Sequence, residues 1–343
     1  MKAARFVGVG QPVVIEDLPK PTPSRPDEVI VRIAGAGVCR TDLHILEGAA
    51  PLQPAPPPPF TLGHENAGWI ETVGPAVSHL HPGDPVILHP AITCGVCLPC
   101  RQGNDMYCAN TSFPGVDGSD GGFAELLRTS ARAVVALPSG TDPAPLAPLA
   151  DAGLTAYHAV ARIAGLLKPG SVALVVGVGG LGHIAIQLLR ALTPAKVVAL
   201  DLNPERLELA RQLGAAGGLL ADDPDRRQEL SRWTGGSGAD VVLDFVAEGK
   251  TPELALSLLR RGGTYSIVGY GGTLTVRTVD MIVNETNILG NFVGSYRDLV
   301  ELMELHRQGL VRVSAHRYSL PDAAKALDDL SHGRVLGRAV LIP

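Results

Sequence analysis

The chain has few aromatic residues and little excess charge of either sign. Aromatic side chains make up 4% of its 343 residues, and charged side chains make up 18%. The 34 acidic residues outnumber the 29 basic ones, so the formal net charge is −5. A surface that binds nucleic acid or an anionic membrane is normally strongly basic. We therefore expect neither nucleic acid nor a membrane to be a partner of this chain.

Long uninterrupted apolar runs are also lacking. Residues 1–10 contain no apolar stretch of the length that a secretory signal peptide needs. Residues 172–189 resemble a membrane span at first sight, but glycines, His183 and Gln187 interrupt them. That segment predicts a buried strand, turn and helix instead. We expect a soluble, cytoplasmic protein.

Only five cysteines are present, and four of them fall within residues 94–108. The spacing Cys94-x2-Cys97-x2-Cys100-x7-Cys108 lets four thiolates close a tetrahedral shell around zinc, which leaves no position open for chemistry. The CxxCxxC part also permits an iron–sulfur cluster, and free thiols are a third interpretation. Nothing else in the sequence indicates electron transfer, so we predict a structural zinc.

The length predicts two domains, since a domain usually takes about 100–200 residues. Short strands separated by proline and glycine fill the first 140 residues, which is typical of a β-rich domain. These strands are expected at residues 5–9, 13–17, 28–37, 68–73, 85–88, 123–128 and 133–137. A stiff proline-rich surface loop is expected at residues 54–59.

From about Leu149 apolar strands alternate with helical periods, which predicts an α/β domain with a parallel sheet covered on both faces. The expected strands are residues 172–178, 197–201, 241–246 and 264–269, and the expected helices are 181–192, 204–213, 226–233 and 252–261. Two more helices, at 297–308 and 321–331, flank a short strand, and a last strand at 335–342 closes the chain.

A glycine-rich turn follows the first strand of this second region. Residues 177–182 read Gly-Val-Gly-Gly-Leu-Gly and fit the GxGxxG pattern, and Asp201 ends the next strand. In a dinucleotide site the glycines let the pyrophosphate approach backbone N–H groups at a helix N-terminus, while the acid binds the adenosine ribose. An ordinary turn with an unrelated aspartate is the alternative. The strand, the helix and the acid all agree with a dinucleotide site. Because the carboxylate of Asp201 would repel the 2′-phosphate of NADP, we predict NAD as the cofactor.

Two further motifs lie in the β-rich region, namely Cys39-Arg40-Thr41-Asp42-Leu43-His44 and Gly63-His64-Glu65. Together with the four-cysteine lobe, the glycine turn and Gly337-Arg338, they resemble the zinc-dependent medium-chain alcohol dehydrogenases over essentially the whole chain. Among family members the chain looks most like bacterial NAD-dependent enzymes that oxidise secondary or aromatic alcohols. The resemblance implies a GroES-like catalytic domain at residues 1–149, completed by 288–343, and a doubly wound Rossmann domain that binds NAD at 150–287.

The resemblance also implies two zinc ions in each chain, one structural and one catalytic. Cys39 and His64 match ligands of the catalytic zinc. Asp151 stands where the family usually has a cysteine as the third ligand, and carboxylate is an acceptable substitute that leaves the fourth position open. The alternative for Asp151 is that it only caps the following helix.

Further roles follow from the same resemblance. Zinc would lower the pKa of the bound alcohol, and the alkoxide would transfer hydride to NAD. Thr41 would take the alcohol proton and His44 would pass it to solvent. Asp42 would orient the His64 imidazole, and Glu65 would lie behind the metal as an occasional ligand.

The remaining site residues are carried over by position. The predicted cofactor contacts are Arg40, Thr155, Gly177, Gly179, Gly180, Leu181, Gly182, Asp201, Asn203, Arg206, Val246, Val268, Gly269, Tyr270, Phe292, Val293 and Arg338. The predicted substrate pocket contains Thr41, Tyr270, Phe292 and Val293. Its apolar lining favours small to medium alkyl or aryl alcohols, with a polyol or amino-alcohol substrate as the alternative. A catalytically silent dinucleotide-binding protein is a more remote one. The resemblance implies a homotetramer, with a homodimer as the alternative.

Overall fold

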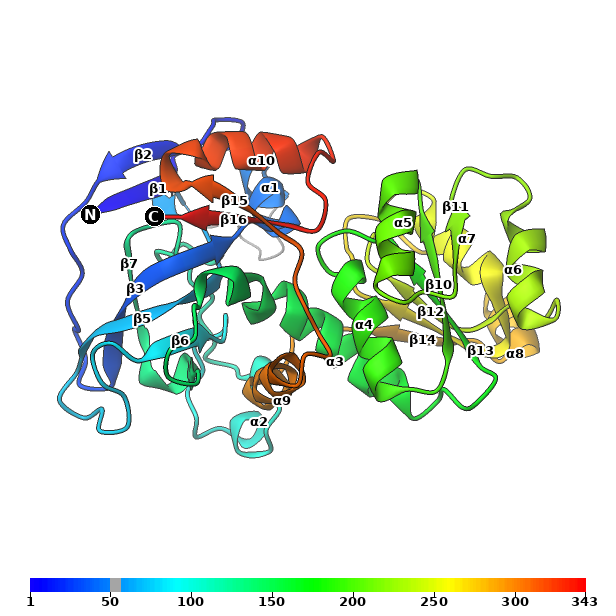
Figure 1. Ribbon diagram of the computed structural model, residues 1–343, viewed down its shortest axis with the longest axis horizontal. Coiled ribbons are helices and arrows are strands. Elements are labelled where there is room, and N and C mark those ends of the chain that lie inside the picture. Colours follow the sequence, from blue (N-terminus) through cyan, green and yellow to red (C-terminus); the bar gives the residue numbers. More distant parts are fainter. Residues whose placement is uncertain (50–56) are drawn as a thin grey trace. The chain divides into compact units, whose positions relative to one another are not determined.

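The computed structural model describes residues 1–49 and 57–343 and divides into two compact units (Figure 1). Unit 1 contains residues 1–154, 294–303 and 313–343, and unit 2 contains residues 155–293 and 304–312. The proline loop predicted at 54–59 falls partly outside the described residues, because 54–56 are not among them. In the part of the chain that is described, no helix is both long and apolar enough to cross a membrane.

Unit 1 is built on two sheets. A three-stranded sheet has the order β2-β1-β4, and a seven-stranded sheet has the order β15-β16-β3-β5-β6-β8, with β7 also paired to β3. The strands are β1 (Lys2–Phe6), β2 (Val14–Asp17), β3 (Glu28–Gly37), β4 (Phe60–Thr61), β5 (Glu65–Val73), β6 (Pro85–Leu88), β7 (Leu126–Ser130), β8 (Val134–Ala136), β15 (Ala315–Ser319) and β16 (Arg338–Ile342). Strands from both ends of the chain thus share one sheet.

The helices of unit 1 are short. They are α1 (Arg40–Leu46), α2 (Leu98–Arg101) and α10 (Ala323–Ser331), with 3-10 turns η1 (Asp105–Tyr107), η2 (Ala131–Ala133), η3 (Ala144–Ala150) and η4 (Leu320–Asp322). Fully or almost fully buried Phe60, Phe123, Ile70 and Leu341 belong to the apolar core between these elements. This core holds the strand ends that carry the predicted metal ligands.

Strand positions in unit 1 are close to those predicted, and the shifts have physical causes. β3 and β6 have the predicted bounds. β1 lies three residues earlier than the predicted 5–9, because Lys2 to Arg5 pair with Asp17 to Val14. Residues 40–46, for which no element was predicted, form helix α1, whose capping box joins Cys39 and Asp42.

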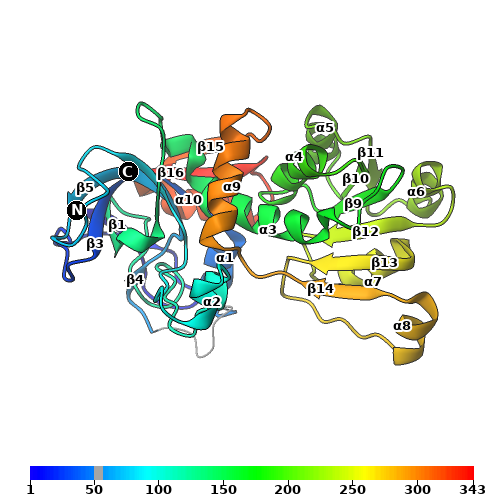
Figure 2. The ribbon, with the colours of Figure 1, turned by 90° about the horizontal axis from the view of Figure 1, so that it is seen from below.

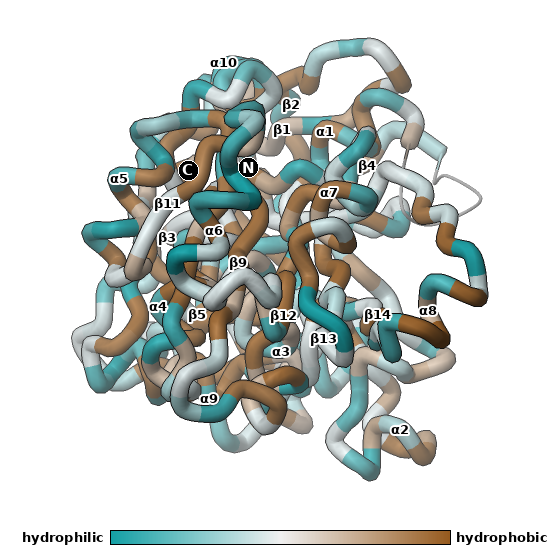
Figure 3. Tube along the Cα trace, turned by 90° about the vertical axis from the view of Figure 1, so that its right-hand side faces the viewer, coloured by the Kyte–Doolittle hydropathy of each residue, from teal (hydrophilic) through white to brown (hydrophobic). Residues whose placement is uncertain are grey.

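Unit 2 contains a six-stranded parallel sheet in the order β11-β10-β9-β12-β13-β14, the doubly wound dinucleotide-binding order. Its strands are β9 (Val172–Val176), β10 (Lys196–Asp201), β11 (Gly217–Leu220), β12 (Ala239–Asp244), β13 (Leu259–Ile267) and β14 (Asn287–Gly290), and its helices are α4 (Gly182–Leu192), α5 (Pro204–Gln212), α6 (Arg226–Thr234), α7 (Thr251–Leu258) and α8 (Thr278–Asn284). Figure 3 shows the apolar colour along the central strands β9 and β12, whose residues form the core of this sheet. Helices α3 (Ala152–Ala164) and α9 (Tyr296–Arg307) each have residues in both units.

Unit 2 differs from the prediction at several points, and neither α8 nor β14 was predicted. The predicted helix at 252–261 ends at Leu258, because Leu259 already pairs with Ala239 of β12. Strand β11 was not predicted, since it begins with two glycines, a residue type that is depleted in strands. We predicted a domain boundary at 287/288; β14 starts at Asn287 and pairs with β13, and the compact unit 2 extends to Val293. Figure 2 shows β14 at the sheet edge near α8.

Candidate metal centres and dinucleotide site

The four lobe cysteines converge as the spacing predicted. Their sulfur atoms all lie within 4.8 Å of one another, and the Sγ–Sγ distances are 3.4 Å for Cys97–Cys100 and 4.0 Å for Cys94–Cys100. Four ligands at the usual Zn–S distance of about 2.3 Å would place the sulfurs about 3.8 Å apart in a tetrahedron. The donor set therefore fits a closed zinc site.

Backbone amides support thiolates in the lobe. The N–H of Cys94 donates to Cys108 Sγ and the N–H of Cys97 donates to Cys94 Sγ, both at 3.4 Å. Hydrogen bonds from the backbone of Val96 and Cys97 lower the pKa of Cys94 to about 6. The backbone of Cys100 lowers the pKa of Cys97, but burial and the neighbouring thiols outweigh it and raise that pKa to about 11. A thiol that ionises near neutral pH is ready to bind a metal.

The second cluster contains Cys39, His64, Glu65 and Asp151, whose ligand atoms also lie within 4.8 Å of one another. Strand pairing brings the first three together, because Gly37 at the end of β3 is opposite Glu65 at the start of β5. Asp151 arrives from a distant segment, between η3 and α3. The structure thus joins the three predicted catalytic-zinc ligands and places Glu65 beside them.

Negative charge surrounds the imidazole of this cluster. His64 Nδ1 lies 3.5 Å from Asp42 Oδ1, and His64 Nε2 lies 3.5 Å from Asp151 Oδ2. Burial lowers the pKa of His64, but Asp42, Asp151 and Cys39 outweigh it and raise the pKa well above its usual value. Among the described residues, the buried His64 Nδ1 and Asp42 Oδ1 face each other but have no hydrogen-bond partner. A thiolate, an imidazole and a carboxylate are a ligand set for zinc, and a cation there would compensate this charge.

Glu65 is held on one side of the cluster by Arg338. Both of its carboxylate oxygens accept hydrogen bonds from the Arg338 guanidinium, and Oε1 also accepts from Ala152 N at 3.1 Å. Glu65 is fully buried and Arg338 is 3% exposed. Burial lowers the pKa of Arg338, but the charges of Glu65 and Cys39 outweigh burial and raise it, so Arg338 stays charged. Burial also raises the pKa of Glu65, and the guanidinium of Arg338 opposes that shift. A Cβ at Gly37 would lie 1.9 Å from Glu65 Oε2, so only glycine leaves room for this carboxylate. The predicted contact of Arg338 with the cofactor stays a prediction.

The predicted proton-handling residues lie on α1, directly after Cys39. Asp42 Oδ2 accepts from Cys39 N at 2.8 Å, which leaves Oδ1 facing His64 as predicted. Thr41 is partly exposed, Arg40 is exposed and His44 is buried at 8% exposure. The roles predicted for these three residues stay predictions.

The glycine turn has the geometry of a pyrophosphate-binding turn. Gly177 adopts a left-handed φ of +84°, and a Cβ at Gly182 would lie 1.8 Å from the Gly177 oxygen. A Cβ at Gly179 would meet no atom within 4 Å. The first and third glycines are thus required by the fold, whereas the second leaves open space for a ligand. Gly180 and Leu181 complete the turn before α4.

Asp201 binds this turn from the end of β10. Its Oδ2 accepts from Val178 N at 2.7 Å and its Oδ1 accepts from Asn203 N at 2.9 Å. Arg206 Nη1 lies 3.9 Å from Asp201 Oδ1. Asn203 caps α5 through a hydrogen bond from Glu205 N. The acid and its two predicted neighbours therefore lie together next to the turn.

The other predicted cofactor contacts follow strand ends of unit 2. Val246 follows β12, and Val268 and Gly269 follow β13. Tyr270 and Phe292 are 40% and 47% exposed. Val293 has a left-handed φ of 47°, and Thr155 is buried on α3. Thr41, predicted for the same substrate pocket, belongs to unit 1.

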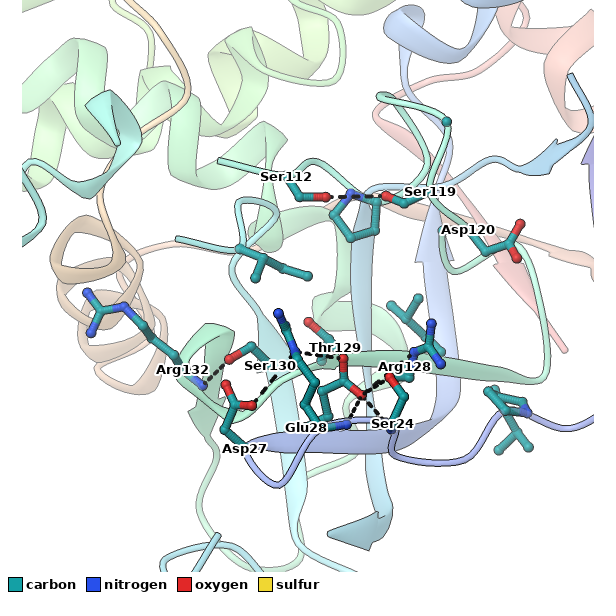
Figure 4. A pocket seen from close by; sticks show the side chains of 18 of the residues that line it. Ser24, Asp27, Glu28, Ser112, Ser119, Asp120, Arg128, Thr129, Ser130 and Arg132 are labelled. Atoms are coloured by element: carbon teal, nitrogen blue, oxygen red, sulfur yellow. Dashed lines mark hydrogen bonds and ion pairs between the residues drawn. The ribbon is translucent and has the colours of Figure 1, made fainter. Parts of the chain in front are cut away.

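A separate hollow of about 1070 Å³ lies in unit 1 (Figure 4). Its charged side chains are largely paired with one another, since Glu28 contacts Arg25 and Arg128, and Arg132 Nε donates to Thr93. Of the metal-cluster residues only Cys94 lines it. We therefore do not assign the reaction to this hollow.

Three polar partnerships were not predicted from the sequence. They are the Arg338 partnership with Glu65, the Asp244–Tyr265 pair at the end of β12, and Asn291, whose Nδ2 donates to Ile267 O at 2.9 Å. The signal available for Asp244 was a single acid inside the apolar run 241–246.

Comparisons with known proteins agree with this geometry. The family model for the alcohol dehydrogenase GroES-like domain matches residues 25–139, and that for zinc-binding dehydrogenases matches residues 180–308. An alcohol dehydrogenase of Geobacillus stearothermophilus is 37% identical over 344 residues, with 99% of each chain covered. The crystal structure of an alcohol dehydrogenase from Aeropyrum pernix superposes with a TM-score of 0.96 at 49% identity, with 100% of both chains covered. The acetophenone reductase of Geotrichum candidum, solved with NAD, gives 0.88 at 31% identity, with 100% of this chain and 97% of that one covered.

Proposed function

The chain belongs to the zinc-dependent medium-chain alcohol dehydrogenase family, and we propose that Cys39, His64 and Asp151 hold the catalytic zinc of this NAD-dependent enzyme. The observation that carries this assignment is the convergence of a thiolate, an imidazole and a carboxylate within 4.8 Å. Three protein ligands leave one coordination position for a substrate oxygen, whereas the four-cysteine lobe leaves none.

Zinc bound at this cluster supplies Lewis-acid polarisation of an alcohol or carbonyl oxygen. The residues of the chain then handle orientation and protons. Asp42 keeps the His64 ring in place through its Oδ1 at 3.5 Å. Thr41 takes the alcohol proton, and His44, two residues after Asp42 on the same helix, carries it onward. Glu65, fixed by Arg338, keeps negative charge beside the metal and serves as an occasional ligand.

NAD binds to unit 2, with its pyrophosphate on the turn at residues 177–182 and its adenosine ribose on Asp201. The open space next to Gly179 and the carboxylate of Asp201, 2.7 Å from Val178 N, support this arrangement. Asn203 and Arg206 flank the ribose.

The substrate is a small to medium secondary alcohol with alkyl or aryl groups, or the matching ketone. The exposed aromatic rings of Tyr270 and Phe292 suit an apolar substituent, and one relative carries the name acetophenone reductase. A polyol or amino-alcohol would require several polar side chains, whereas this set offers only the hydroxyls of Thr41 and Tyr270. A catalytically silent protein would not need three metal ligands and Thr41 to be retained together.

The chain assembles as a homotetramer, with a homodimer as the alternative. Helix α8 has no buried residue, and its Val279, Ile282 and Val283 are 52%, 74% and 55% exposed. A contiguous apolar surface of this kind is typical of a protein interface. We also place the protein in the cytoplasm, because the thiolates of the lobe require a reducing compartment.

The test is NADH formation with a panel of alcohols, together with zinc content. We expect two zinc ions per chain, and a kcat/KM for 1-phenylethanol or 2-butanol at least about tenfold above that for sorbitol. Protein that holds two zinc ions but turns over none of the alcohols would contradict the enzymatic role. A preference for sorbitol would contradict only the proposed substrate class. Light scattering then determines the number of chains.

A further inference from the structure

A fully buried acid lies at the carboxyl end of β12. Asp244 accepts hydrogen bonds on Oδ1 from Val246 N and from Ala247 N, each at 2.9 Å. Its Oδ2 accepts from the hydroxyl of Tyr265 at 2.8 Å, and Tyr265 is also fully buried. Burial, followed by the charge of Asp244, raises the pKa of Tyr265, so the hydroxyl remains a donor. A buried carboxylate is costly unless it is hydrogen-bonded, and here both of its oxygens are used.

The backbone of Asp244 also connects the end of β12 to the segment that follows β13. Its carbonyl oxygen accepts from Val268 N at 2.9 Å and from Gly269 N at 3.0 Å. Ala247 adopts a left-handed φ of 48°, which is uncommon for alanine. The hydrogen bond from Ala247 N to Asp244 holds this conformation, so one residue shapes the chain after both β12 and β13.

Val246 lies close to both the glycine turn and the end of β13. A Cβ at Gly177 would lie 2.6 Å from Val246 Cγ2, and a Cβ at Gly269 would lie 2.4 Å from the Val246 oxygen. Val246 is thus seated between the first glycine of the turn and the end of β13. These segments lie at the carboxyl ends of adjacent parallel strands, where α/β sheets bind their ligands.

The sheet order indicates which half of the dinucleotide meets these residues. The strands run β11-β10-β9-β12-β13-β14, and a dinucleotide binds across the point where this order reverses, between β9 and β12. Asp201 on β10 marks the adenosine half. The segments that Asp244 holds therefore lie in the other half, which receives the nicotinamide.

We propose that Asp244, fixed by Tyr265, is a positioning residue that determines how the nicotinamide half of NAD is seated. It acts through Val246, Ala247 and the Val268–Gly269 segment and does not contact the reacting atoms. The inference rests on the proposed function, in which NAD binds at the glycine turn. Asp201 is held by Val178 and Asn203 and needs no contribution from Asp244, so the adenosine half is independent.

The test compares NAD with ADP-ribose, which contains the adenosine and pyrophosphate parts but lacks nicotinamide. In Asp244→Asn we expect NAD affinity and kcat to fall by about 10- to 100-fold, because small misplacements of a reacting group have effects of this size. ADP-ribose affinity should stay within about twofold. Tyr265→Phe keeps the backbone hydrogen bonds of Asp244 and should show the same selectivity with a smaller loss. It also tests the inference if the Asn variant does not fold.

Matched controls separate positioning from stability. Asp240 lies at the opposite end of β12, where its Oδ2 accepts from Val172 N at 2.7 Å, and Tyr318 donates to Asp329 in unit 1. Asp240→Asn and Tyr318→Phe should lower the Tm without changing the ratio of NAD to ADP-ribose affinity. The inference would be overturned if the Asp244 and Tyr265 variants lost affinity for NAD and for ADP-ribose equally. It would also be overturned if these variants had only a lower Tm and unchanged affinities. A different result would contradict the proposed function and not this inference: wild-type enzyme that binds NAD, with an Asp201→Ala variant whose ADP-ribose affinity is unchanged, would show that NAD does not bind at the glycine turn.

Discussion

Replacing Asp151 by Asn is the sharpest test of the catalytic metal site, because the two interpretations of this residue predict opposite results. Asp151 and His64 are 3.5 Å apart, and the carboxylate lies in the same cluster as Cys39. With Zn²⁺, one thiolate and one carboxylate give a site of zero net charge. The Asn variant leaves the site with a charge of +1 and a neutral amide, which is a poor zinc ligand.

The expected loss exceeds that of a change outside the ligand set. Substitutions of groups that only orient a ligand weaken metal binding by about 10- to 100-fold. We therefore expect more than 100-fold weaker binding for Asp151→Asn, which corresponds to more than about 2.7 kcal/mol at 1.36 kcal/mol per decade. Zinc content should fall from two ions per chain to one, and kcat should fall to background, whereas NAD binding should persist.

The assay is zinc content by elemental analysis after gel filtration, chelator competition and kcat. Asp142→Asn is a matched control, because Asp142 Oδ1 accepts from Ala144 N at 3.1 Å at the start of η3, which ends beside Asp151. This variant should keep both zinc ions. Asp151→Cys should recover part of the activity with a shifted pH optimum, since it restores a thiolate ligand. If Asp151→Asn keeps two zinc ions and near-normal kcat, Asp151 is only a helix cap.

Three further outcomes follow from the structure. Cys100→Ser should remove the structural zinc and lower the Tm by several degrees while NAD still binds; an unchanged zinc content would contradict the closed lobe. Asp201→Ala should narrow the preference for NAD over NADP, because it removes a carboxylate that would face the 2′-phosphate; a wild-type kcat/KM that is higher with NADP would refute this. Burial raises the pKa of Asp117, but hydrogen bonds from Ser119, Ser112 and backbone amides outweigh burial and lower it. The pKa of Asp117 in the folded protein therefore lies below its pKa in the unfolded chain. The ionised Asp117 therefore stabilises the folded protein fully above its unfolded-state pKa of about 4, and this stabilisation is lost as the pH falls through the folded-state pKa. Asp117→Asn should reduce the difference in urea midpoint between pH 7 and pH 3.

Repetitive patterns explain why most of unit 2 could be predicted. Apolar strands followed by amphipathic helices identify a parallel sheet, and Gly177 and Gly182 of the turn are required by a left-handed φ and a close backbone approach, respectively. β11 escaped prediction because Gly217 and Gly218 have no side chains that signal a strand. Both glycines pack closely, since a Cβ at Gly217 would lie 2.5 Å from the Trp233 ring and a Cβ at Gly218 would lie 3.1 Å from Leu207 Cβ.

The candidate site was predictable only in part. The cysteine lobe follows from spacing, because its four ligands are close in the chain. Asp151 is 87 residues from His64 (151 − 64), and only the resemblance to a family placed it beside the metal. The partnerships of Glu65 with Arg338 and of Asp244 with Tyr265 join segments whose contact depends on the complete fold, and single acids in a sequence do not indicate their partners.

The pairing of β3 with β5 has a consequence for folding. Gly37 is opposite Glu65, so Cys39 and His64 extend from the same end of one antiparallel ladder. A slip of one residue would move His64 by about 3.3 Å and turn alternate side chains to the opposite face of the sheet. The thiolate and the imidazole could then no longer bind one ion together. Zinc would therefore stabilise only chains with the correct register, so metal supplied during refolding would select against mispaired strands.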